Sequence, residues 1–82
     1  MEQLVHSPKS LGNAIKQQRK IRKLNQTEAG SAFKIEQSTI SSIEQGTLGT
    51  RLETLFRVLA ALDLEMVIRP KVVVPSKTKE SW

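Results

Sequence analysis

The chain has 82 residues, a formal net charge of +5 and a sequence pI of about 10.0, which fits one small basic domain. It contains no cysteine and a single histidine, His6, so disulfide bonds, zinc–thiolate sites and a catalytic triad are excluded, and neither an enzymatic activity nor a metal or cofactor is expected. No apolar run approaches the ~20 residues of a membrane span, so we expect a cytoplasmic protein without a membrane partner.

The positive charge is concentrated near the N-terminus. Residues 1–24 contain six lysines and arginines against a single acid, Glu2, whereas residues 25–50 carry a net negative charge. A basic stretch of this kind favours a nucleic acid or another anionic surface as a partner. It is equally compatible with an ordinary solvated helix face, and the charge alone does not decide between the two.

The first predicted helix covers residues 8–23. Ser7 is a suitable N-cap and Pro8 suits the first helical position, and apolar side chains then recur at helical spacing. Residues 1–7 show no such period, so they are expected to form a flexible N-terminus.

Two short helices are predicted next, over residues 26–33 and 36–45. Asn25 and Glu28 form a capping box at the start of the first, and Gly46 stands where a glycine ends the second. Isolated helices below ~12 residues are marginal in water, so these two must pack across each other on a shared core.

A longer helix and a strand complete the predicted domain. Thr50 and Glu53 have the spacing of another capping box, and the apolar period that follows them is the strongest in the chain. Residues 65–69 have the pattern of a short strand that Pro70 ends, and residues 72–74 are a candidate for another. Residues 71–82 are expected to form a basic C-terminal tail, in which residues 75–82 have a disordered composition.

These elements predict an all-α domain of four or five helices, with one short C-terminal strand, over residues 8–70. A solitary strand leaves unpaired backbone groups on both edges, so we expect it to pair with the same strand of a second copy in a homodimer. The predicted core consists of Leu11, Ile15, Leu24, Phe33, Ile35, Ile40, Ile43, Leu52, Leu55, Phe56, Leu59 and Leu62.

The predicted helix over residues 36–45 has an unusual polar face. It carries glutamine, serine and threonine, without lysine or glutamate pairs in its middle. These residue types are weak helix formers, but they reach phosphates and base edges well. The pair of short helices therefore favours a DNA-binding helix-turn-helix, with an ordinary polar surface as the alternative.

Several spaced motifs resemble the Cro/CI-type (XRE) helix-turn-helix family. The most specific is Gln37-Ser38-Thr39-Ile40-Ser41-x-Ile43-Glu44-x-Gly46, which is preceded at matching distances by Arg19 and by Leu24-Asn25-Gln26-Thr27-Glu28. The similarity covers residues 11–62. Within that family, the single strand and the basic tail ending in Trp82 are similar to those of HipB-type antitoxins, the partners of HipA-type serine/threonine kinase toxins.

The resemblance implies a dimeric repressor that binds palindromic double-stranded DNA, neutralises a HipA-type kinase toxin and autoregulates its operon. One alternative is a free-standing Cro/CI-type transcriptional regulator without a toxin partner. Another is a protein-binding inhibitor whose helix-turn-helix has lost DNA affinity, although the basic first helix and Gln37 weigh against it. Because tryptophan is a preferred interface anchor, Trp82 favours the toxin-binding protein over the free-standing regulator.

The resemblance also implies a role for each matching residue. The side chains expected to contact DNA bases are Gln37, Ser38, Ser41 and Ser42. Those expected to contact DNA phosphates are Gln26, Thr39, Arg51 and Lys34. The expected dimer strand contains Met66, Val67 and Ile68, and the expected toxin contact is Trp82. Arg19 and Glu44 match a pair that ties the first helix to the third, which is a structural role.

Three residues depart from the family's pattern. Lys34 stands where glycine is usual, at a position that often needs a positive φ, and this costs on the order of 1 kcal/mol. Gly30 stands where alanine is preferred, which weakens the short helix but gives the small contact that a close helix crossing needs. Glu36 replaces a neutral or basic residue beside the major groove, where a carboxylate either accepts from a cytosine amino group or discourages binding to wrong sequences.

Overall fold

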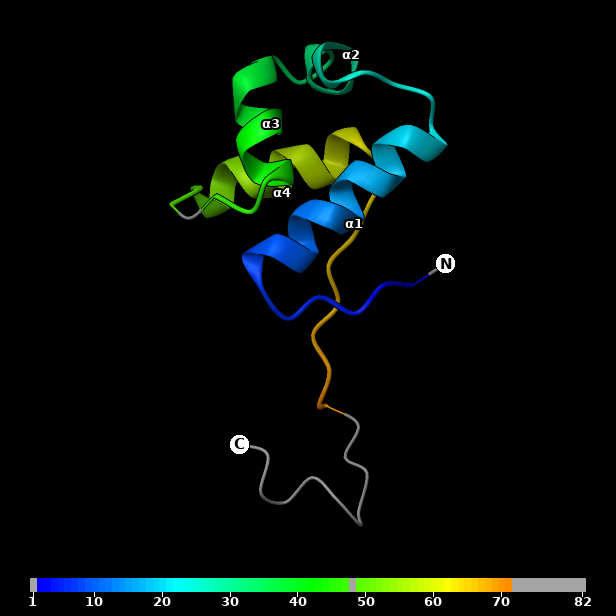
Figure 1. Cartoon of the computed structure of the whole chain (residues 1–82), viewed down its shortest axis with the longest axis vertical. Coiled ribbons are helices and arrows are strands. Elements are labelled where there is room, and N and C mark those ends of the chain that lie inside the picture. The colour runs from blue at the N-terminus through cyan, green and yellow to red at the C-terminus, as the bar shows by residue number, and fades with distance from the viewer. Residues whose placement is uncertain (1, 48, 72–82) are drawn as a thin grey trace.

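The computed structural model describes residues 2–47 and 49–71, and these form four helices (Figure 1). They are α1 (Pro8–Ile21), α2 (Gln26–Ser31), α3 (Gln37–Glu44) and α4 (Leu52–Ala61). The predicted all-α fold is confirmed, with four helices. Each helix starts within one or two residues of its expected start, and α1 and α2 end two residues earlier than expected.

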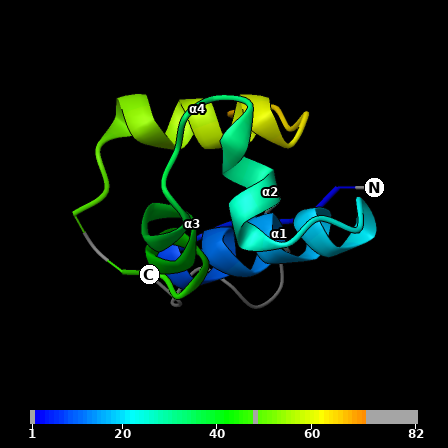
Figure 2. The ribbon, with the colours of Figure 1, turned by 90° about the horizontal axis from the view of Figure 1, so that it is seen from above.

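The two longer helices form a support for the two shorter ones. Seen from above, α1 and α4 lie on opposite sides of the domain, and α2 lies between them, with α3 beside α1 (Figure 2). The contacts between helices join α1 with α3, α2 with α3, and α2 with α4. The short helices therefore rest on each other and on both long helices, as their marginal intrinsic stability requires.

The core lies between the four helices. The fully buried side chains come from α1, α3 and α4 and from the residue directly after α4: Ile15, Ile40, Val58 and Leu62. The remaining buried apolar side chains are Ala29, Ile35, Ile43, Leu55 and Leu59, with Leu11, Leu24 and Leu64 packed against them. Nine of the twelve predicted core positions are thus buried or packed against the core.

Three side chains predicted in the core are exposed instead. Phe33, Leu52 and Phe56 retain 39%, 69% and 51% of their accessible surface. Phe33 lies in the turn after α2, and Leu52 and Phe56 share the outer face of α4, one helical turn apart. Ala29 and Val58 occupy buried positions that the expected core did not include.

The helix starts confirm two of the three expected caps. Ser7 caps α1 together with Ser10, and Asn25 and Glu28 form the expected capping box of α2. The capping box expected from Thr50 is wrong, because α4 begins at Leu52 with Arg51 as its N-cap, and no side chain closes this cap.

Residues 65–69 run in an extended path away from the helices without forming a hydrogen-bonded strand in the described part of this single chain (Figure 1). Within residues 2–47 and 49–71, an exposed ion pair joins Arg69 of this segment to Glu2, at 3.4 Å. Pairing with a second copy, which the sequence predicts, stays a prediction. The tail over residues 72–82, with Trp82, lies outside the described residues.

Tight backbone geometry joins the helices. Gly46 adopts a φ of +78° after α3, and Lys34 adopts a φ of 56° in the turn between α2 and α3, as expected. A Cβ on Gly30 would lie 2.3 Å from the Ile35 carbonyl oxygen, so this glycine does permit the close turn. Gly12 has a similar role that the sequence analysis missed, since its Cβ would lie 2.4 Å from the Ile43 carbonyl oxygen where α1 meets α3.

Candidate nucleic-acid interface

The polar face of α3 is open to solvent. Gln37, Ser38 and Ser42 are exposed and Ser41 is half-buried, whereas Ile40 and Ile43 on the opposite side are buried in the core. The helix is therefore held by its apolar face and presents the four predicted base-contacting side chains together. Its hydroxyl and amide groups can each donate and accept hydrogen bonds, as base edges require.

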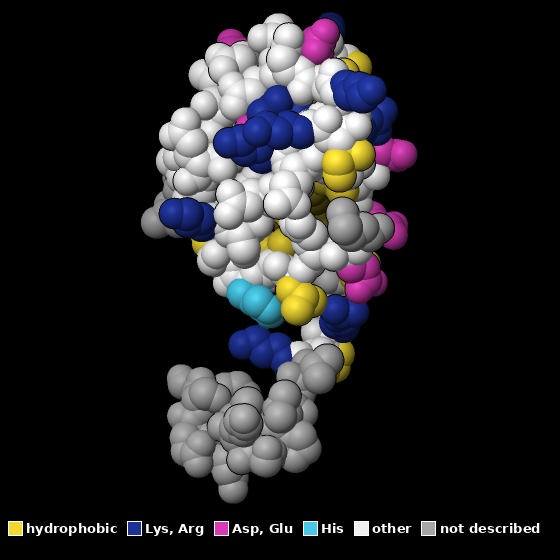
Figure 3. Space-filling view, turned by 45° about the vertical axis from the view of Figure 1, so that its right-hand side comes forward, with side chains coloured by type: hydrophobic (Ala, Val, Ile, Leu, Met, Phe, Trp, Pro, Cys, Tyr) yellow, Lys and Arg dark blue, Asp and Glu magenta, His cyan; other side chains and the backbone are white. Residues whose placement is uncertain are grey.

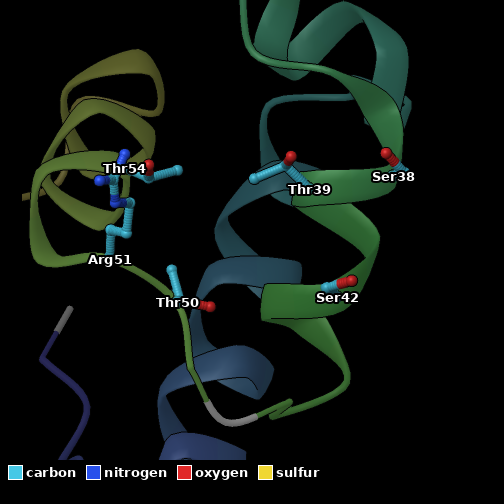
Figure 4. Close-up of a pocket in the computed structure, with 6 residues that line it drawn as sticks. All are labelled: Ser38, Thr39, Ser42, Thr50, Arg51 and Thr54. Atoms are coloured by element: carbon cyan, nitrogen blue, oxygen red, sulfur yellow. The ribbon is translucent and has the colours of Figure 1, made fainter.

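A shallow hollow lies between this face and the start of α4. Figure 4 shows the side chain of Thr39 pointing from α3 toward α4, with Arg51 on the opposite wall. The lining residues are Ser38, Thr39, Ser42, Thr50, Arg51 and Thr54. Five hydroxyl groups and one guanidinium form a surface suited to a phosphate group of a DNA backbone.

The hollow brings together two of the residues that the sequence analysis expects at DNA phosphates. Thr39 and Arg51 share this surface, although they come from different helices. Thr50 and Thr54 also line the hollow. The sequence analysis interpreted Thr50 as a capping residue and did not single out Thr54. Lys34 does not line the hollow and lies exposed in the turn between α2 and α3.

A buried ion pair fixes α3 on α1. Arg19 Nε lies 2.6 Å from Glu44 Oε2, and Arg19 Nη2 donates to Glu44 Oε1 at 3.0 Å. A third guanidinium nitrogen, Nη1, donates to the Leu24 carbonyl oxygen at 2.8 Å. The predicted pairing of Arg19 with Glu44 is confirmed, and its bidentate geometry gives it a defined orientation.

The surroundings of the ion pair favour both charges. Burial raises the pKa of the Glu44 carboxyl, but hydrogen bonds from Arg19 and Gln26, with the charges of Arg19 and Lys16, outweigh it and lower the pKa. The hydrogen bond to Glu44 raises the pKa of Arg19, against the opposing effect of burial. Glu44 is therefore ionised at neutral pH.

Gln26 links this ion pair to the exposed face of α3. Its Nε2 donates to Glu44 Oε1 at 3.1 Å, and its Oε1 accepts a hydrogen bond from Nε2 of Gln37. Gln26 was expected to contact a phosphate, and no sequence motif indicated that its amide would bind two other side chains. The structure thus connects a predicted phosphate contact with a predicted base contact.

Glu36 stands at the beginning of α3 without a capping role. It is the N-cap residue, it is exposed, and its side chain makes no cap hydrogen bond. This differs from α1 and α2, whose N-cap side chains both bond to the helix. The Glu36 carboxylate is therefore not committed to the helix start.

The surface is rich in lysine and arginine, several of which gather on the upper part of the face that Figure 3 shows.

Within residues 2–47 and 49–71, no group of three or more histidine, cysteine, aspartate or glutamate side chains has the arrangement of a metal site. In the same part of the chain, no helix has the length and apolar character needed to cross a membrane.

The comparisons with known proteins agree with this geometry. A family model described as helix-turn-helix matches residues 15–68. Antitoxin HipB of Escherichia coli K12 is 36% identical over 66 residues, which cover 80% of this chain and 75% of HipB. The chain belongs to the helix-turn-helix family that includes antitoxin HipB.

A second relative is longer than this member of the family. The uncharacterized HTH-type transcriptional regulator y4dL of Sinorhizobium fredii is 41% identical over 58 residues, which cover 71% of this chain. The match spans only 30% of the length of y4dL. The similarity to this regulator is therefore limited to the helix-turn-helix portion.

Solved structures of HipB have the same fold. A HipA-HipB-O2-O3 complex contains a chain that matches with a TM-score of 0.80 and 34% identity, covering 87% of this chain and 100% of that one. A HipB-O4 20mer complex matches with a TM-score of 0.78 and 35% identity, covering 84% and 97% of the two chains. The resemblance to HipB inferred from the sequence motifs is confirmed.

Proposed function

We propose that this chain is a sequence-specific DNA-binding repressor and the antitoxin of a HipA-type serine/threonine kinase. The observation that carries the proposal is the exposed glutamine and serine face of α3 beside a hollow lined by hydroxyl groups and Arg51. The family membership supports it, because HipB has been solved both in a complex with a 20mer and in a complex with HipA.

DNA recognition follows from the position of α3 on the surface. With α3 in the major groove, Gln37, Ser38, Ser41 and Ser42 face base edges, and the hollow receives a phosphate between Thr39 and Arg51. The base contacts supply the sequence preference, and the phosphate contacts fix the register of the protein on the duplex. The buried pair of Arg19 and Glu44 holds α3 at a constant angle to α1.

A homodimer gives the protein its palindromic target. Met66, Val67 and Ile68 retain 45%, 71% and 92% of their accessible surface in the single chain, and Leu52 and Phe56 are also exposed. Pairing residues 65–69 of two copies would bond their free backbone groups and cover apolar surface. Two copies of α3 then face half-sites about one DNA turn apart.

Selection from a pool of random duplexes tests the DNA-binding part. We expect the wild-type chain to select a palindrome. The Gln37→Ala variant should bind it about 1–3 kcal/mol more weakly and lose preference at one base pair per half-site. The Arg51→Ala variant should weaken binding to all sequences alike and lower the salt slope by about one per protomer. Equal behaviour of both variants on selected and random DNA would refute these roles.

The toxin contact is tested by truncation at residue 74. Trp82 is the only tryptophan and ends a polar tail, so its indole would supply the main apolar contact to the kinase. Removing residues 75–82 should weaken binding to a HipA-type kinase and leave operator affinity nearly unchanged. Undiminished kinase binding would remove Trp82 from the interface. Failure of the intact chain to bind any such kinase would favour a free-standing regulator, to which the similarity with y4dL also corresponds.

A further inference from the structure

Three lysines form a row along one exposed side of α1. Lys9, Lys16 and Lys20 are separated by seven and four residues, so their side chains leave the helix on the same side. Asn13 stands between the first two on that side, so no acidic or apolar side chain interrupts the row. Since each helical residue adds about 1.5 Å, this lysine row is about 16 Å long.

The lysine row has no anionic partner in the described part of the chain. All three side chains are exposed, and neither of the two ion pairs within residues 2–47 and 49–71 involves a lysine. The sequence of α1 contains no acidic residue. Lys16 and Lys20 are one helical turn apart, and like charges at this spacing destabilise a helix. The row therefore lowers the stability of the helix, and an anionic partner would offset this repulsion.

The row borders the side of α1 that packs on α3. A Cβ on Gly46 would lie 2.8 Å from Lys9 Cα, so the first lysine stands at the end of α3. Farther along α1, a Cβ on Gly12 would lie 2.6 Å from the Glu44 carbonyl oxygen. The charge of Lys16 acts on the same residue of α3, because it helps to lower the pKa of the Glu44 carboxyl. The lysine row therefore runs beside α3.

The row also lies on the same side of the domain as the exposed face of α3. Glu44, on which the charge of Lys16 acts, accepts a hydrogen bond from Gln26, whose amide also contacts that exposed face. The other side of α1 turns toward the end of α4, where Gln18 donates to the Leu62 carbonyl oxygen at 3.3 Å. The lysines lie away from that side and next to the polar surface that α3 presents.

We propose that the lysine row binds the phosphate backbone of the DNA strand opposite to the one that Arg51 contacts. The inference rests on the proposed function, because it requires α3 to lie in the major groove. That groove is about 12 Å wide, so a helix inside it has a sugar–phosphate backbone on either side. The hollow with Arg51 faces one backbone, and the lysine row faces the other.

The side chains around α3 support this division. Thr39 points from α3 toward α4 and the hollow, as Figure 4 shows, whereas Glu44 binds Arg19 of α1. Thr39 and Glu44 are five positions apart, which places them about 140° from each other around the helix. The hollow therefore lies on one flank of α3 and the lysine row on the other, with the exposed polar face between them.

The chemistry of lysine suits a phosphate backbone better than a base edge. An ammonium group is a compact charge on a flexible stem, so it binds a phosphate without requiring one geometry. Such contacts carry no sequence information, and they strengthen binding to all duplexes alike. The position of the row also favours DNA over an acidic protein, because a protein at this place would occupy space beside α3 that the duplex requires.

A double variant, Lys16→Gln with Lys20→Gln, tests the row through the salt dependence of binding. It removes two charges and keeps unbranched polar side chains. Arg22→Gln with Lys71→Gln is the matched control, since it removes the same charge from exposed residues outside the row. Affinity for the selected duplex is measured over a range of salt concentrations. The double variant should lower the salt slope by about two per protomer, and the control by less than about one, with base preference unchanged in both.

Neutral phosphates identify the strand that the row contacts. In a series of duplexes, a methylphosphonate replaces one phosphate at a time and removes its charge. Wild type and control should lose affinity at the phosphates that face the row, and Lys16→Gln with Lys20→Gln should be insensitive there. Arg51→Ala should be insensitive at phosphates of the other strand. Lys16→Arg with Lys20→Arg keeps both charges and should retain the wild-type salt slope.

Three results would overturn the inference. If the double variant unfolds at the wild-type temperature and has the salt slope of the control, the row is an ordinary solvated face. If it loses affinity for a HipA-type kinase and not for DNA, the row belongs to a protein interface. If it and Arg51→Ala are insensitive on the same strand, the two surfaces do not lie on opposite sides of the groove. A wild-type chain without any sequence preference would refute the proposed function instead, which the other three results leave intact.

Discussion

Replacing Lys34 by glycine is expected to stabilise the protein. Lys34 adopts a φ of 56° in the turn between α2 and α3, a conformation in which the Cβ of an L-residue approaches the backbone too closely. The turn depends on this geometry, because the backbone amide of Lys34 donates to the Ser31 carbonyl oxygen at 3.2 Å and that of Ile35 to the Gly30 carbonyl oxygen at 2.9 Å. Glycine adopts the same φ without the steric penalty.

The expected gain is the difference between two opposing effects. The left-handed conformation costs a non-glycine residue about 1–2 kcal/mol, and the greater freedom of glycine in the unfolded chain returns roughly 0.5–1 kcal/mol of that difference. The net stabilisation is therefore about 0.5–1 kcal/mol. For a domain of this size that raises the midpoint of thermal unfolding by roughly 2–8 °C.

Thermal unfolding followed by circular dichroism measures this change, with Lys34→Ala as the control. Alanine removes the charge but keeps the Cβ, so it should give no gain in stability. Both variants lose the cation, so both should lower the salt slope of DNA binding by about one per protomer if Lys34 contacts a phosphate. A Lys34→Gly variant that is no more stable than Lys34→Ala would refute the argument from backbone strain.

Three other predictions concern the ion pair, the dimer and Gly30. Glu44→Gln should cost about 3–5 kcal/mol of unfolding free energy, because it leaves Arg19 buried without its charged partner. The pKa of Glu44 is lowered in the fold, so its contribution to stability is present above the ordinary pKa of 4.5 and is lost as the pH falls through the folded pKa. Denaturant titrations at several pH values should therefore find less acid sensitivity in this variant than in the wild type. Ile68→Asp should shift the wild-type dimer to monomer in sedimentation experiments, and a monomeric wild type would contradict the pairing of residues 65–69. Gly30→Ala should destabilise by roughly 1–2 kcal/mol in denaturant titrations, since its Cβ would meet the Ile35 carbonyl oxygen at 2.3 Å and this outweighs the better helix propensity of alanine.

The local signals in the sequence were sufficient to predict the helices and two of their caps. Ser7 and Asn25 act at helix starts where their side chains bond to the backbone within three residues, so the information is contained in the neighbouring sequence. The start of α4 shows the limit of such signals. Thr50 has the spacing of a capping residue, but it lies beside Thr39 and Arg51 in the hollow, and a tertiary environment takes precedence over the local pattern.

The candidate site could be predicted as a set of residues but not as a network. The motif identified Gln26, Gln37, Arg19 and Glu44 separately, and only the pairing of the two charges was expected. The contact between Gln26 and Gln37 depends on the angle at which α2 crosses α3. That angle is fixed by the close approach at Gly30 and the left-handed turn at Lys34, and neither effect can be measured from residue spacing.

Two of the three errors in the predicted core, those at Leu52 and Phe56, have one physical explanation when the outer face of α4 is considered with residues 66–68. A helical period identifies apolar residues that will be covered, but it does not distinguish coverage by the same chain from coverage by a partner. Leu52 and Phe56 are exposed in the single chain, as are Val67 and Ile68. An exposed apolar stripe and a short unpaired segment are two separate disadvantages for a soluble monomer, and one interface with a second copy would remove both. Phe33 lies instead in the turn after α2, where the Arg57 guanidinium donates to its carbonyl oxygen. Its exposed ring is therefore a consequence of the turn that orients α3.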